Sequence, residues 1–335
     1  YCRLICCHNE RNLRMNTMKW LLKREYWEHK GGFFWAPAVV SSIIALFAIG
    51  SMLITMAFGS KNGININNHH GMNLQEILGQ ISEPDKMEMA KALAATYPAI
   101  AMPLFIVMTF VIFFYCLGNL FDDRKDRSIL FWKSLPISDQ NTVISKALTA
   151  LVVAPVISIT FAMALALFLL FSLLIAAAIL GVNLFGLVLG DSNFYLVFIQ
   201  LVSFLPIYAL WALPTVGYLM FVSAWAKTKP FLWAVGVPVM GGVIISWMNV
   251  IFSAGFDLSK YWQIVVGRGL GSVLPGSWLA HMSDEKMISN SDNPMSALLS
   301  NTYQLLGTAD LWIGVVIGLA FLYAAVKMRR YRDEG

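Results

Sequence analysis

The sequence predicts an all-α integral membrane protein. Apolar residue types make up 58% of the 335 residues and charged types only 13%, whereas soluble domains average about 45–50% and about 25%. The apolar residues also gather into long runs, several of them reaching the ~20 residues that a helix needs to cross the hydrocarbon core of a bilayer. Most charged residues lie between these runs. Composition and pattern therefore both indicate a bundle of membrane-spanning helices.

Six runs are long enough to be spans, and residues 18–335 are predicted to form one transmembrane domain. The predicted spans are about 33–58, 97–120, 147–182, 194–225, 231–252 and 311–326. The third exceeds what one perpendicular helix requires, so we expect it to begin in the cytoplasm and to extend past the far headgroups. Pro206 and Pro214 are expected to kink the fourth span.

The chain before the first span divides into two parts. Residues 1–17 are treated as a doubtful N-terminal extension, because the plausible initiating residues are Met15 and Met18. The segment from Met18 to Lys30 predicts an amphipathic helix, with lysines on one side and Trp20 and Trp27 on another. Such a helix is typical of the membrane interface, where its lysines meet anionic headgroups.

Two segments between spans carry other signals. In the polar segment 59–96, His69 and His70 are adjacent, so they point in different directions, and no third ligand is near; an exposed loop is favoured over a metal site. Residues 255–310 contain apolar helical pieces that glycines and Pro275 interrupt. We expect a short helix or a re-entrant hairpin on the outer side, between the fifth and sixth spans.

The distribution of basic residues predicts the orientation. In the six-span arrangement, 18 of the 24 Lys and Arg residues fall on the side that holds both termini. Cytoplasmic segments carry such an excess, so both termini are expected in the cytoplasm. The expected location is a bacterial inner membrane. No basic cluster shows the aromatic interleaving of a base-stacking surface, so nucleic acid is not expected as a partner.

The segment between the second and third spans, Phe121 to Lys146, is densely charged and is expected to be a loop in water. Its middle reads as a short helix that Pro136 ends, and Ser138 offers an N-cap for the next helix, with Asp139 in its first turn. Exposed aromatic residues on such a helix favour docking of a partner. The alternative is that Phe131 and Trp132 rest at the headgroup layer.

The run from Asp123 to Ser138, DRKDRSILFWKSLPIS, with Lys146 beyond it, resembles the first cytoplasmic loop of type-2 ABC export permeases. The resemblance implies that the loop carries a coupling helix that docks on an ATPase subunit. It further implies two ATPase subunits, which hold ATP and Mg²⁺, and a second copy of this chain or a similar permease. The expected ATPase contacts are Arg127, Ile129, Phe131, Trp132 and Leu135.

The chain lacks the motifs of an enzyme that handles nucleotides or hydrolyses bonds. It has no P-loop, no HExxH and no GxSxG motif, so we expect no catalytic residue, no metal and no cofactor on this chain. Ion-coupled carriers bury ionisable groups at mid-membrane, and the apolar runs hold almost none. Two alternatives stay open: a membrane-embedded enzyme that uses His69, His70 or His281, and a non-transporting sensor or scaffold.

Two amide side chains are the candidates for a cargo path. Gln200 and Asn249 lie within apolar runs, and an amide is costly to leave unpaired in hydrocarbon. Both are therefore candidates for a cargo path or for a dimer seam, although interhelical hydrogen bonding would explain them as well. A mostly apolar lining would suit a lipid-like or amphipathic cargo, or an apolar peptide.

Overall fold

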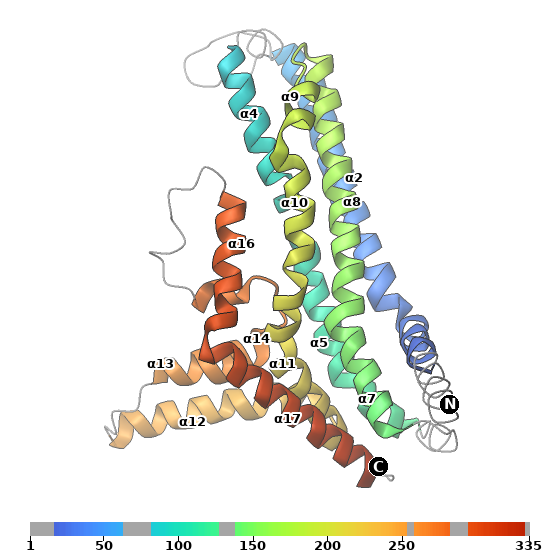
Figure 1. Cartoon of the computed structure of the whole chain (residues 1–335), viewed down its shortest axis with the longest axis vertical. Helices are drawn as coiled ribbons and strands as arrows, with labels where there is room; N and C mark the ends of the chain where they lie inside the picture. The colour runs from blue at the N-terminus through green and yellow to red at the C-terminus, as the bar shows by residue number, and fades with distance from the viewer. Residues whose placement is uncertain (1–16, 63–81, 127–137, 253–257, 282–293, 332–335) are drawn as a thin grey trace, which may run out of the picture.

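The computed structural model of the protein describes residues 17–62, 82–126, 138–252, 258–281 and 294–331 (Figure 1). The structure is 92% helical, with no strand among these residues. Within the described residues, six helices are long and apolar enough to cross a membrane, which agrees with the predicted all-α class and with six predicted spans. They are Gly31–Ala57, Glu83–Lys125, Asp139–Ile179, Ser192–Trp225, Leu232–Phe252 and Ala309–Tyr331.

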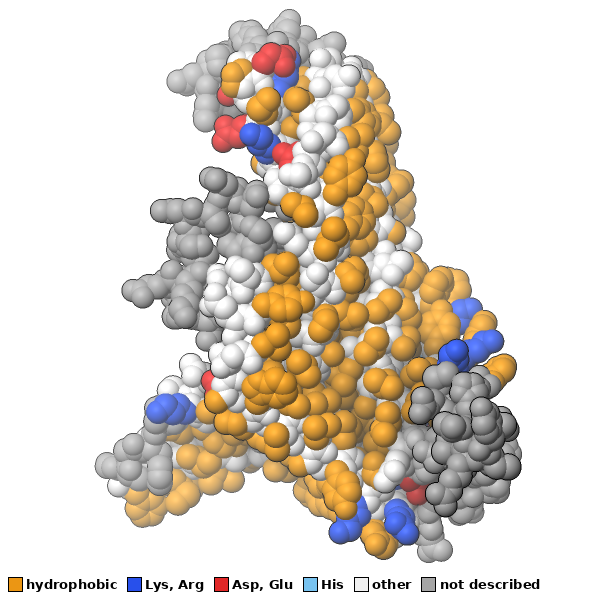
Figure 2. Space-filling view, viewed as in Figure 1, with side chains coloured by type: hydrophobic (Ala, Val, Ile, Leu, Met, Phe, Trp, Pro, Cys, Tyr) orange, Lys and Arg blue, Asp and Glu red, His pale blue; other side chains and the backbone are white. Residues whose placement is uncertain are grey.

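Hydrophobic side chains cover most of the visible face of the molecule, and charged ones gather mainly near its two ends (Figure 2). A soluble monomer rarely exposes so large an apolar surface. The six apolar helices together with this surface indicate an integral membrane protein.

Two of the helical rods are longer than the predicted spans. The first joins α4 (Glu83–Thr96), η2 (Tyr97–Ala101) and α5 (Met102–Lys125), and the second joins α7 (Asp139–Leu148), η3 (Thr149–Val153) and α8 (Ala154–Ile179). At 1.5 Å per residue each rod exceeds about 60 Å, against about 40–45 Å for a bilayer with its headgroups. Each rod is therefore longer than a bilayer is thick.

The fourth span is divided near one proline and continuous at the other. It consists of α10 (Ser192–Ser203) and α11 (Leu205–Trp225), with Pro206 at the start of α11, where the missing N–H has no helical partner to lose. The helix is interrupted at Phe204, next to this proline. At Pro214 α11 continues without interruption. The kinks expected at the two prolines stay predictions.

Close packing of α11 against α17 (Ala309–Tyr331) forms the most extensive helix pair of the described residues. Glycine makes this approach possible, because a Cβ added at Gly217 would lie 2.5 Å from the carbonyl oxygen of Gly318. Gly314 and Gly318 are four residues apart in α17, which is the small-residue spacing that lets two membrane helices touch through their backbones.

The fifth span leaves the main bundle. It comprises η4 (Leu232–Gly236) and α12 (Val237–Phe252), and Figure 1 shows α12 beside α13 (Leu258–Tyr261), extending away from the other helices. Gly241 and Gly242 admit the rings of Tyr261 and Trp262. Much of the remaining surface of α12 is apolar and exposed.

Short helices fill the region between the fifth and sixth spans, as the broken apolar pattern predicted. They are α13, η5 (Trp262–Arg268), α14 (Gly269–Gly271), η6 (Ser277–His281), α16 (Pro294–Gln304) and η7 (Leu305–Gly307). Arg268 attaches this region to the bundle: its guanidinium lies 4.5 Å from the centre of the Trp211 ring and donates to the carbonyl oxygen of Asp310.

Candidate functional site

The predicted ATPase contacts, Arg127, Ile129, Phe131, Trp132 and Leu135, lie outside the described residues. The structure describes the two ends of their segment. On one side α5 continues to Lys125, and on the other α7 begins at Asp139. Ser138 caps α7 as predicted, since its hydroxyl accepts from the backbone N–H of Asn141 at 3.2 Å.

A buried network of charges joins these two ends. Asp123, near the end of α5, accepts from Arg329 at 3.0 Å, and Asp139, at the start of α7, accepts from the same guanidinium at 3.1 Å. Lys146 lies 3.6 Å from Asp123 and 3.2 Å from Glu25. We call these five residues the charge network.

Burial distinguishes this network from surface ion pairs. Glu25 is 0% exposed and Lys146 1%, and Asp123 and Arg329 are also buried; only Asp139 is partly exposed. Charges removed from water are tolerated where they are paired and hydrogen-bonded. The network meets this condition, because the Tyr115 hydroxyl also donates to Glu25, at 2.9 Å.

The network corrects the expectation that Phe121 to Lys146 is a loop in water, at the two ends that the structure describes. Residues 121–125 and 139–146 belong to helices α5 and α7. Their buried charges are paired with Glu25, from the helix at 17–28, and with Arg329, from the other end of the chain. These partners are separated from them by about 100 to 200 residues in the sequence.

Arg124 provides a second attachment of α5. Its guanidinium donates to the carbonyl oxygens of Ser223 and Ala226, at 2.6 and 2.8 Å. These carbonyls lie at the C-terminal end of α11, where a helix leaves acceptors unpaired and favours positive charge. The Ser223 hydroxyl in turn accepts from the backbone N–H groups of Leu120 and Phe121. The end of α5 is therefore fixed to α11 as well as to α17.

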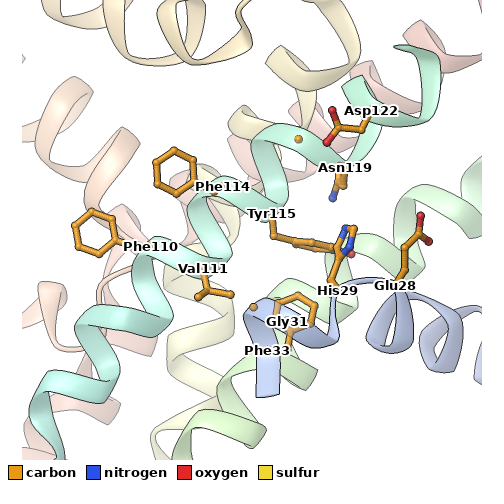
Figure 3. A pocket seen from close by; sticks show the side chains of 12 residues that line it. Glu28, His29, Gly31, Phe33, Phe110, Val111, Phe114, Tyr115, Asn119 and Asp122 are labelled. Atoms are coloured by element: carbon orange, nitrogen blue, oxygen red, sulfur yellow. The ribbon is translucent and has the colours of Figure 1, made fainter. Parts of the chain in front are cut away.

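A groove of about 500 Å³ lies between α5 and the start of the first span, next to the network. Such a volume is within the usual range for small-molecule sites. Its polar and apolar lining residues are separated (Figure 3). The polar side consists of Glu28, His29, Tyr115, Asn119 and Asp122, and the apolar side of Phe33, Phe110, Val111 and Phe114.

His29 lines the groove and also contacts Tyr115, which binds Glu25 of the charge network. Its ring packs edge-on against Tyr115, with 4.7 Å between the ring centres. Burial lowers the pKa of His29 below its ordinary 6.5, and the positive charge of Lys146 acts in the same direction; the nearby carboxylates oppose both. These carboxylates are Glu25 and Glu28 on the same helix and Asp122 on α5. Neutral His29 is the form that this surrounding favours near pH 7.

The predicted path residues lie in different parts of the molecule. Gln200 is buried on α10, and its side-chain oxygen has no hydrogen-bond partner among the described residues. Asn249 is half-buried near the end of α12 that points away from the bundle (Figure 1). The structure of a single chain therefore does not bring the two amides to one path.

The histidines of the enzyme alternative cannot be placed relative to one another. His69 and His70 lie outside the described residues, and so does the side chain of His281. Within the described part of the chain, no group of three or more His, Cys, Asp or Glu residues could hold a metal ion.

Comparisons with known proteins identify no relative. No family model matches the chain. Nor does any curated protein or solved structure. The residues and their geometry therefore carry the functional argument.

Proposed function

We propose that the chain is the membrane-spanning permease subunit of a type-2 ABC exporter. The charge network is the observation that supports this proposal best. It fixes both ends of the segment 127–137, which resembles a coupling helix, to one guanidinium on α17. A force applied to that segment would therefore displace α5, α7 and α17 together.

In this proposal, two separate ATPase subunits bind ATP and Mg²⁺ and dock on the loop between α5 and α7. Their closure pushes on the segment 127–137. Asp123 and Asp139 pass the displacement to α5 and to the long α7–α8 rod, while Arg329 moves α17 with them. The helices thereby alternate between inward and outward access. This chain supplies no ATPase site of its own.

The same proposal places both termini in the cytoplasm of a bacterial cell, with the protein in the inner membrane. The helix at 17–28 then lies in the inner interface, where exposed Trp20 and Trp27 would meet headgroups. The short helices of 258–281 then form the re-entrant segment of the outer side. The exposed apolar surface of α12 is available for a second copy of the chain or for lipid.

The proposal is tested by purifying the tagged chain from its native membrane in mild detergent and by assaying the eluate for ATPase activity. A co-eluting subunit with a P-loop and vanadate-sensitive hydrolysis are expected. The double variant Trp132→Ala, Leu135→Ala is expected to insert normally and to lower recovery of that subunit about tenfold or more, because apolar anchors dominate such contacts.

The matched control is Trp35→Ala with Leu53→Ala, which removes the same two side-chain types from exposed positions of the first span. Recovery of the ATPase subunit should be unchanged in this control. If the Trp132 and Leu135 variant retains full recovery, the docking assignment is wrong. If the wild-type chain elutes without any ATPase, the permease proposal itself fails, and the scaffold or enzyme alternatives gain weight.

A further inference from the structure

The groove beside the charge network contains a polar group that the protein does not satisfy. Asn119 is 3% exposed, and neither its side-chain nitrogen nor its side-chain oxygen has a hydrogen-bond partner among the described residues. Figure 3 shows its amide directed toward the polar side of the groove, near His29. A buried amide of this kind is ordinarily paired, so the groove offers one donor and one acceptor to an occupant.

A free carboxylate lies at the mouth of the same polar side. Asp122 is three residues beyond Asn119 on α5. Its backbone carbonyl accepts from the N–H of Asp126, but its carboxylate is in no hydrogen bond or ion pair with the described residues. Gly118 leaves room for it: a Cβ at that position would lie 2.8 Å from the Asp122 carboxylate. The opposite carboxylate, Glu28, is paired with Arg24 at 3.2 Å. The unpaired charge at the mouth is thus negative.

The rest of the groove is suited to a hydrocarbon chain. Phe33 forms a buried part of the wall, and Phe110 and Phe114 are largely exposed on the outer surface of α5. The groove is therefore continuous with the apolar surface that faces lipid. Its polar end lies at the level of the charged helix ends, where headgroups are found.

We propose that this groove binds a membrane lipid whose headgroup carries a primary ammonium, as in phosphatidylethanolamine. The ammonium donates to the Asp122 carboxylate and to the Asn119 oxygen, and the Asn119 nitrogen donates to a phosphate or ester oxygen. One acyl chain follows Phe110 and Phe114. A choline headgroup has no N–H to donate, and an anionic headgroup meets the Asp122 charge. The site thus selects among lipids, whether or not the chain is a transporter.

The test is native mass spectrometry of the purified, delipidated full chain. Phosphatidylethanolamine, phosphatidylcholine and phosphatidylglycerol are added separately with identical acyl chains. The first is expected to half-saturate one site at a concentration at least fivefold lower than the other two. The comparison at constant acyl chain removes the contribution of general lipid contacts with the apolar surface.

Variants of the groove separate its parts. Asn119→Leu removes both hydrogen-bonding groups at similar size, and Asp122→Asn removes the charge from an exposed position; each is expected to abolish the preference for the amine lipid. Gly31→Leu is expected to weaken binding of all three lipids, because Gly31 lines the groove and a Cβ there meets nothing within 4 Å. Glu88→Gln, on exposed α4 outside the groove, is the control and should behave as wild type.

Thermal unfolding of each variant distinguishes a lost site from a lost fold. Asn119→Leu should unfold no earlier than wild type, because it removes an unsatisfied buried amide. Equal binding of the three lipids by the wild-type chain would overturn the proposal, as would an unchanged preference in both Asn119→Leu and Asp122→Asn. In that case water alone satisfies Asn119.

Discussion

Removal of the Lys146 charge is the sharpest test of the charge network. Lys146→Met keeps most of the length and apolar stem of the side chain but leaves Glu25, which is 0% exposed, without its cation. Asp123 keeps its ion pair with Arg329. Loss of one partner of a buried pair costs about 3–5 kcal/mol, because the remaining charge stays out of water. We expect a loss of that size in the free energy of unfolding.

The assay is a titration with SDS in mixed micelles, with helicity followed by circular dichroism. Glu25→Gln alone should cost a similar amount. The double variant Glu25→Gln, Lys146→Met should cost about 1–3 kcal/mol less than the sum, because neither change then leaves a charge unpaired. This coupling measures the pair itself.

The control is Lys86→Met, which breaks the surface pair of Lys86 with Glu83. That pair has a distance of 2.8 Å, but the Glu83 side chain is 82% exposed, so its loss should cost no more than about 1 kcal/mol. A cost for Lys146→Met no larger than this control, with additive effects in the double variant, would refute the assignment. The charges would then be solvated and the helix ends not held by them.

Two further predictions concern packing and pH. Gly318→Ala should destabilise the protein by about 1–3 kcal/mol, because its Cβ would lie 2.8 Å from the backbone of Leu213; Gly50→Ala, whose Cβ meets nothing within 4 Å, should be neutral or stabilising. For His29, burial lowers the native pKa, so the unfolded chain binds more protons below pH 6.5. Thermal stability should therefore fall as the pH drops below 6.5, and His29→Gln should reduce this fall; an equal fall in the variant would contradict the reasoning.

The spans could be predicted from the sequence because each is a local property. A run of about 20 apolar residues must form a helix in lipid, whatever it packs against. The N-cap at Ser138 is also local, since one hydroxyl decides it. The lengths of the rods were underestimated because polar helices such as α4 and α7 continue the apolar ones, and hydropathy alone ends each span at its first charges.

The charge network could not be predicted in the same way. Its members lie in three regions that each look like ordinary charged flanks of a span, and the arginine that joins them is 206 residues from Asp123. One local signal was available. Leu21 and Glu25 are four residues apart, hence on one helix face, and both are buried; a carboxylate that shares the apolar face of a helix needs a partner.

Asn119 was not predicted as a site residue, because its surroundings in the sequence are apolar and not charged. It lies within an apolar run, where one amide changes the hydropathy little. Only the structure shows that it faces a groove and has no partner among the described residues. A polar residue inside a span therefore needs the packing of its neighbours before its role can be judged.

Ion pairs, and not apolar contacts alone, join α5, α7 and α17 at the ends of the segment 127–137. Well-packed apolar side chains would often stabilise a helix bundle as well as buried ion pairs do. An apolar contact, however, tolerates a shift between helices, whereas a hydrogen-bonded ion pair specifies which residue meets which. Asp123 and Asp139 both bind the guanidinium of Arg329. The two ends of the segment are thus fixed relative to each other and to α17, so a displacement of either end is expected to move α17 as well.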